Sequence, residues 1–194
     1  MAAPSMTIST AILLFLLLPA ISATRSNPNP NNTNSDYIRT ECASKYEPGL
    51  CYDSLIAHAN EVQGDPAKLT VVAVRVSFSS ARKTMAYISN LSRKPNPDKV
   101  LKVCVSSFGD AIYQMQRSTR AMNHENFIND ESMSHRLFNV TTWLGAAVNS
   151  QRTCVDEFGS VKSDVYDRVV YVQKLTSQAI GFINWYLEGA VQMD

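Results

Sequence analysis

The sequence predicts an all-α protein, in which a disulfide-stapled N-terminal helical hairpin precedes an up-down-up-down four-helix bundle. Apolar residues recur at helical spacing along four long stretches, and the alternation typical of β-strands is absent from the sequence. Four cysteines follow an apolar leader. Four long helices with short connections pack most simply as an antiparallel bundle, so we expect a single domain built in this way.

The first 23 residues have the features of a removable signal peptide. Residues 11–18 form an uncharged apolar run that ends at Pro19, and small residues follow. This run is shorter than the roughly 20 apolar residues that span a bilayer. The rest of the chain has no second long apolar run. We therefore expect secretion into the extracellular space and no membrane contact once the signal peptide is removed.

The hairpin is expected at residues 36–62, after a flexible tail at 24–35 that is rich in Asn, Pro and Ser. Asp36 can cap a first short helix, because Asp is a preferred residue at that position. Pro48 can open a second helix, since proline is tolerated at the first helical position. Two short antiparallel helices would result.

The four cysteines indicate two disulfides, because an even number of cysteines in a secreted chain is typical of disulfides rather than of metal ligands or a catalytic thiol. Four cysteines allow three pairings. Cys42 and Cys51 flank the turn at 47–49, which would bring the two hairpin helices side by side. This turn favours the pairs Cys42–Cys51 and Cys104–Cys154.

The bundle is expected between residues 65 and 190. Its first helix begins with Asp65 as the cap and Pro66 at the first helical position, and it continues to about Leu91. A proline-containing break then leads into a second helix that ends at about Met122, and a polar loop follows at 123–133. Apolar residues at helical spacing mark the third and fourth helices: Leu137, Val140, Leu144, Ala147, Cys154 and Phe158, then Val165, Val169, Val172, Ala179, Ile180, Ile183 and Leu187.

The interior is expected to be filled by bulky side chains, which argues against a cavity for a small ligand. The side chains concerned are Phe78, Met85, Phe108, Met115, Trp143 and Phe158. A secreted helical module that binds a small apolar ligand between its helices therefore remains only the second alternative.

Charge and residue content argue against other functions. The formal net charge is +1, which gives no basic field for binding nucleic acid. None of the three histidines has the spacing of a nucleophile or metal site, so we expect no catalysis, no cofactor and no metal. His58 and Glu61 are similar to half of a Glu/His metal motif, but a di-metal bundle also needs inward carboxylates on its other helices.

Five motifs occur in order along the chain and include all four cysteines. They lie around Cys42 and Cys51, at 65–69, at 102–113, at 143–156 and at 175–180. Together they resemble the plant invertase and pectin methylesterase inhibitors. The resemblance implies a four-helix bundle after a hairpin, with the first cysteine bound to the second and the third to the fourth.

The resemblance also implies a protein without catalysis that binds a cell-wall enzyme one-to-one and covers its substrate cleft. Many invertase-directed members have a Pro-Lys-Phe segment before the third bundle helix, whereas residues 124–129 read His-Glu-Asn-Phe-Ile-Asn. This difference favours pectin methylesterase as the partner. We thus expect an apoplastic inhibitor that regulates de-esterification of cell-wall pectin; the alternative target is a cell-wall or vacuolar acid invertase.

The partner is expected to contact polar residues on the second and third bundle helices, which would insert into an elongated groove of the enzyme. We expect these contacts to be Asp110, Gln114, Arg117, Thr142, Asn149 and Arg152. Arg152 stands where an acidic residue is common in the family. Three sequons make Asn31, Asn90 and Asn139 candidates for N-glycosylation.

Overall fold

A computed structural model describes residues 30–122, 133–161 and 163–191. Every regular element in these ranges is a helix, and the predicted all-α class is confirmed. The signal peptide expected at 1–23 and most of the loop expected at 123–133 lie outside the described residues. So do the first six residues of the expected flexible tail.

The N-terminal hairpin contains α1 (Pro30–Ala43), α2 (Pro48–Leu55), the 3₁₀ turn η1 (Ile56–His58) and α3 (Ala59–Val62). It begins earlier than expected, because residues 30–35 belong to α1 rather than to a flexible tail. A contact with α3 accounts for this: the Asn34 Nδ2 donates to Asn60 Oδ1 at 3.3 Å. A tertiary contact here outweighs the weak helix propensity of the Asn-rich segment.

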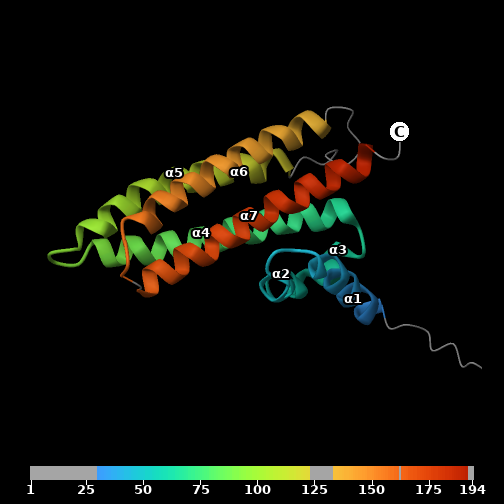
Figure 1. The fold of residues 1–194 in the computed structure, drawn as a ribbon, viewed down its shortest axis with the longest axis horizontal. Coiled ribbons are helices and arrows are strands. Elements are labelled where there is room, and N and C mark those ends of the chain that lie inside the picture. The colour runs from blue at the N-terminus through green and yellow to red at the C-terminus, as the bar shows by residue number, and fades with distance from the viewer. Residues whose placement is uncertain (1–29, 123–132, 162, 192–194) are drawn as a thin grey trace, which may run out of the picture.

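The four-helix bundle contains α4 (Pro66–Ser92), α5 (Lys99–Met122), α6 (Met133–Asp156) and α7 (Asp164–Val191). Each helix packs against the next, and α7 closes the ring against α4. Figure 1 shows α5 and α6 together on one side of the bundle, α4 and α7 on the other, and the hairpin next to the α4–α7 side. The predicted bundle with a preceding hairpin is confirmed.

The start of α4 is fixed by the cap that the sequence predicted. The Asp65 carboxylate accepts hydrogen bonds from the backbone N–H groups of Ala67 at 2.8 Å and Lys68 at 3.1 Å. Pro66 follows at the first helical position. Just before it, Gln63 and Gly64 have φ angles of 54° and 73°. This left-handed backbone ends α3 and turns the chain into the bundle.

The core is filled mainly by aliphatic and aromatic side chains from all four bundle helices. Phe108 and Met115 of α5 are completely buried, as expected, together with Leu144 of α6 and Phe182 of α7. The expectation was wrong for four other bulky residues, which are only partly buried and pack around the core: Phe78, Met85, Trp143 and Phe158. Helical spacing identifies the apolar face of a helix but not the depth at which a residue at its edge is buried.

Polar side chains are also buried inside the bundle, among them Gln151 and Thr176. Gln151 of α6 is completely buried, and its Nε2 donates to the Thr176 hydroxyl of α7 at 3.1 Å. The Thr176 hydroxyl in turn donates to the backbone carbonyl of Val172 at 2.8 Å. Because a buried donor without a partner is costly, this chain of bonds favours one arrangement of α6 against α7.

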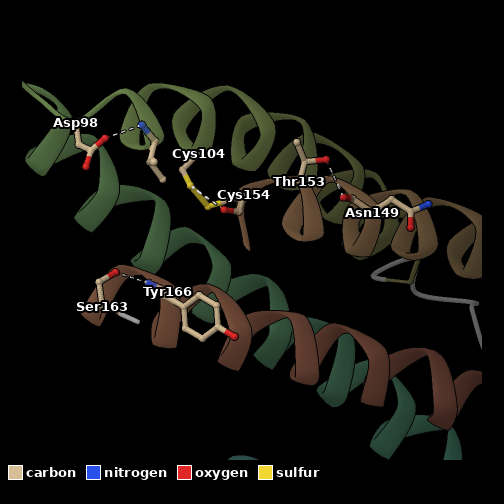
Figure 2. Close-up of a disulfide and its surroundings, with 8 residues drawn as sticks. Asp98, Cys104, Asn149, Thr153, Cys154, Ser163 and Tyr166 are labelled. Carbon is tan, nitrogen blue, oxygen red and sulfur yellow. Dashed lines mark hydrogen bonds between the residues drawn. A yellow bond between two sulfur atoms is a disulfide. The ribbon is translucent and has the colours of Figure 1, made fainter. Parts of the chain in front are cut away.

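Two disulfides join the cysteines in the pairing that the sequence favoured. Cys42–Cys51 staples the hairpin, with Cα atoms 5.5 Å apart, and Cys104–Cys154 joins α5 to α6, with Cα atoms 4.6 Å apart. Figure 2 shows the second disulfide between neighbouring turns of these two helices. Since it links the first turns of α5 to the last turn of α6, it fixes how the two helices are aligned.

The hairpin is attached to the bundle by apolar side chains that join the common core and by charged side chains at the surface. Glu61 of α3 binds Arg75 of α4 through both carboxylate oxygens, and the Lys174 Nζ of α7 lies 2.9 Å from a Glu47 carboxylate oxygen. The Lys45 ammonium lies over the Phe182 ring, 4.6 Å from its centroid. Ion pairs and cation–π contacts therefore add to the apolar packing that holds the hairpin against α4 and α7.

We predict that the two disulfides differ in their contribution to stability. Replacing Cys104 and Cys154 by Ala should lower the free energy of unfolding by about 4 kcal/mol, because the bond closes a long loop in the unfolded chain. The same change at Cys42 and Cys51 should cost about 2.5 kcal/mol, since that loop is short. Urea unfolding of both double variants measures the difference, and an equal or larger loss at Cys42 and Cys51 would contradict this ranking.

Hairpin attachment should depend on pH through Glu61. The hydrogen-bonded Arg75 guanidinium lowers the pKa of Glu61 below its ordinary value of 4.5. Ionised Glu61 therefore stabilises the native state above pH 4.5, and this contribution is lost as the pH falls through the lowered pKa. Wild type should be more stable than Glu61→Gln at pH 6, and the difference should shrink below pH 4.5.

Thermal unfolding across this pH range measures that difference. The control is the same substitution in an Arg75→Ala background, where Glu61 keeps only its contact with His58, so its replacement should have a smaller effect. A wild-type advantage that stays constant from pH 6 to pH 3 would argue against a role for this ion pair.

Candidate functional site

The outer surface of α5 and α6 carries most of the residues that the sequence singled out for partner binding. Asp110, Arg117, Thr142 and Asn149 are exposed, whereas Gln114 is partly buried. All six predicted contacts thus lie on these two neighbouring helices. The sixth, Arg152, also lines a groove against α7.

Arg117 connects the two helices. Its guanidinium carbon lies 4.2 Å from the centroid of the Trp143 ring on α6 and 5.8 Å from that of the Tyr113 ring on α5. A guanidinium over an aromatic face is attracted by the negative charge density of the ring. The contact holds the Arg117 side chain in place at the surface, and it also shows that this edge of α5 faces α6.

Exposed aromatic residues on α5 and α6 were missed by the sequence analysis. Tyr113 is 60% exposed and Phe138 is 69% exposed. A helical projection identifies Tyr113, because nine residues at about 100° per residue place it opposite the buried Cys104. Phe138 lies one turn before Thr142, whose hydroxyl donates to the Phe138 carbonyl at 3.0 Å. We call Tyr113, Arg117, Phe138 and Trp143 the α5–α6 ridge.

The other predicted contacts differ in how far their side chains are exposed to a partner. The Gln114 side-chain oxygen is buried and has no hydrogen-bond partner in the described part of the chain, so the expectation of an exposed contact is wrong for this atom. The Asn149 backbone carbonyl accepts from the Thr153 hydroxyl at 3.2 Å, while the Asn149 side chain projects away from that bond (Figure 2). Asp110 is exposed beside the ridge on α5.

Arg152, also on α6, is exposed. It lines a groove together with Val148 of the same helix, Gln173 and Ser177 of α7, and residues of the hairpin turn. Arg152 follows Val148 by one helical turn, and both lie on the edge of α6 that faces α7. Counting from Cys154 placed Arg152 on the outside of the bundle, where it is exposed, but did not show that it borders α7. Contact of Arg152 with the partner enzyme remains a prediction.

Two of the three candidate glycosylation sites are exposed. Asn90 of α4 and Asn139 of α6 are exposed, and Asn31 lies in α1, where its side chain is not described. Exposure permits modification but does not establish it, so glycosylation of all three remains a prediction.

His58 and Glu61, which are similar to half of a metal motif, make other contacts in the structure. The Glu61 carboxylate binds Arg75, and His58 Nδ1 lies 3.6 Å from Glu61 Oε2. Over residues 30–122, 133–161 and 163–191, no three His, Cys, Asp or Glu side chains form a metal-binding group. Glu61 therefore acts in hairpin attachment.

No helix in the described ranges is both long enough and apolar enough to cross a bilayer.

Comparison with known proteins identifies the family. The model of the plant invertase/pectin methylesterase inhibitor family matches residues 36–181. The chain therefore belongs to this family, a family of inhibitor proteins, as its motifs indicated.

Relatives of this chain include Pectinesterase inhibitor 10 of Arabidopsis thaliana, 33% identical over 169 residues that cover 83% of this chain and 54% of that protein. The chain thus spans only about half of that relative. Pectinesterase inhibitor 9 of Arabidopsis thaliana is 25% identical over 197 residues, which cover 94% of this chain and 97% of the relative.

A solved structure has a similar fold. The crystal structure of a pectin methylesterase inhibitor from Arabidopsis thaliana matches with a TM-score of 0.52 and 16% identity, over 77% of this chain and 95% of that one. At this level of identity the match supports the fold alone.

Proposed function

We propose that this protein inhibits pectin methylesterase by forming a one-to-one complex in which the α5–α6 ridge covers the substrate cleft of the enzyme. Membership of the inhibitor family supports this function, and so do relatives named pectinesterase inhibitors. The observation that favours the ridge as the contact surface is the contact of Arg117 with Tyr113 and Trp143 across two neighbouring helices, with the exposed Phe138 also on α6.

The composition of the ridge suits a protein-binding surface. Tyr, Trp and Arg are enriched among the residues that contribute most to protein–protein affinity. Exposed aromatic side chains bury large apolar areas when a partner covers them. Asp110 and Asn149 lie beside the ridge as polar groups, and the charge of Asp110 can add electrostatic complementarity to the enzyme.

Inhibition would be steric. The ridge is part of two regular helices linked by Cys104–Cys154, so little conformational freedom is lost when it binds. A pre-organised surface of this kind binds more tightly than a flexible one with the same contacts. Polysaccharide is then excluded because the cleft is occupied, and the inhibitor needs no catalytic group of its own.

The protein would act in the apoplast. Two disulfides among the described residues suit an oxidising extracellular compartment. The apolar leader supports entry into the secretory pathway. Secretion would bring the inhibitor to the cell wall, where it would limit de-esterification of pectin.

The Arg117→Ala variant tests the proposed surface. It should weaken inhibition of pectin methylesterase about thirtyfold, because it removes a central arginine from the ridge and frees the Trp143 ring. The measurement is the inhibition constant from titration into an esterase assay at mildly acidic pH. Arg82→Ala is the matched control, since Arg82 is an exposed arginine on α4, and it should inhibit like wild type.

Parallel titration into an acid invertase assay tests the target itself. Saturable loss of esterase activity alone supports the proposal, whereas loss of invertase activity alone would assign the other activity of the family. Inhibition that is equal in wild type and Arg117→Ala would place the interface elsewhere on the molecule.

A further inference from the structure

A groove lies where the hairpin turn meets α6 and α7, away from the α5–α6 ridge. It has a volume of about 400 Å³. Lys45, Tyr46 and Glu47 contribute from the turn, Arg152 from α6 and Lys174 from α7. We call this site the hairpin groove. The proposed inhibition of the esterase makes no use of it.

The charges of the hairpin groove favour an anion. Three cations line it, Lys45, Arg152 and Lys174, against one carboxylate, that of Glu47. Lys174 is paired with Glu47 and Lys45 lies over aromatic rings. Arg152 is exposed and forms no ion pair within the described part of the chain. Its guanidinium is therefore the group best able to bind a carboxylate, which it can do through two parallel hydrogen bonds.

The rest of the lining suits a ligand with hydroxyl groups. Gln173, Ser177 and Gln178 of α7 line the groove, and their side chains make no hydrogen bond within the described residues. Leu50 and Val148 provide apolar surface between these polar groups. Amides and hydroxyls that surround a small apolar surface match a sugar, which presents C–H groups on the faces of its ring and O–H groups at the edges.

Tyr46 stands beside these groups on a turn that is held in place. Its side chain is 99% exposed, an unusual position for an aromatic residue in a folded protein. The turn is fixed on both sides, by the Cys42–Cys51 disulfide and by the Glu47–Lys174 ion pair. A flat ring on a fixed turn is available for stacking against a flat apolar face at little entropic cost.

We propose that the hairpin groove binds an acidic oligosaccharide, namely a stretch of uronic acid residues such as the action of pectin methylesterase exposes in pectin. Arg152 binds a uronate carboxylate, the free amides of α7 bind ring hydroxyls, and Tyr46 packs against a sugar ring. The identity of the ligand rests on the proposed function, because that enzyme converts neutral methyl esters into carboxylates.

Because the hairpin groove and the α5–α6 ridge are separate, the protein can bind the oligosaccharide and the enzyme at the same time. The groove lies between α6, α7 and the hairpin, whereas the ridge lies on α5 and α6. The inhibitor can then hold de-esterified pectin while its ridge covers the enzyme. Such binding would concentrate the inhibitor in the parts of the wall where esterase has already acted.

The test is direct binding of a fluorescent oligogalacturonide to the oxidised protein, measured by polarisation. Wild type should bind the acid oligomer saturably, and added salt should weaken the binding. The fully methyl-esterified oligomer should bind at least tenfold more weakly, because it lacks the carboxylates. Arg152→Gln should weaken binding of the acid oligomer about tenfold, while Arg82→Gln, with the same loss of charge, should bind like wild type.

A second variant separates this site from enzyme inhibition. Tyr46→Ala should reduce oligomer binding and leave inhibition of soluble esterase unchanged, since Tyr46 is not part of the ridge. No binding of the acid oligomer by wild type would overturn the proposal, as would equal binding of the acidic and esterified oligomers or equal binding by wild type and Arg152→Gln. Failure of the proposed function would appear separately, as an absence of esterase inhibition by a protein that still binds the oligomer.

Discussion

The antiparallel pairing of α5 and α6, fixed by Cys104–Cys154, is the constraint on which the rest of the structure depends. The disulfide joins the two helices near one end of the pair. Further along the same pair, Arg117 meets Trp143. Inside the bundle, the buried Gln151 of α6 bonds to Thr176 of α7. A shift of α6 along α5 would break these contacts together.

The hairpin shares the buried apolar core of the bundle, through residues such as Ile38, Leu55 and Val62. Surface ion pairs and the cation–π contacts of Lys45 add to its attachment to α4 and α7. Exposed ion pairs contribute little stability each and respond to salt and pH. These ion pairs are therefore the part of the hairpin attachment that responds to salt and pH.

Much of the fold was predictable because its signals are local. The Asp65–Pro66 start of α4 depends on two adjacent residues, and the four long helices depend on apolar spacing within each helix. Features that depend on tertiary neighbours were not predictable. Contact with Asn60 extends α1 back to Pro30, and the position of α7 determines that Arg152 lines a groove. The ridge was found only in part, since exposure of Phe138 depends on how α6 packs.

Oxidative footprinting of the complex with pectin methylesterase tests most directly whether the ridge is the enzyme-binding surface. The wild-type chain has exposed aromatic side chains on different surfaces, with Tyr113 and Phe138 on the ridge, Tyr46 on the hairpin turn and Tyr171 on α7. Addition of the enzyme should protect Tyr113 and Phe138 from oxidation and leave Tyr46 and Tyr171 as reactive as before. Protection of Tyr46 or Tyr171, with Tyr113 and Phe138 still reactive, would contradict the account.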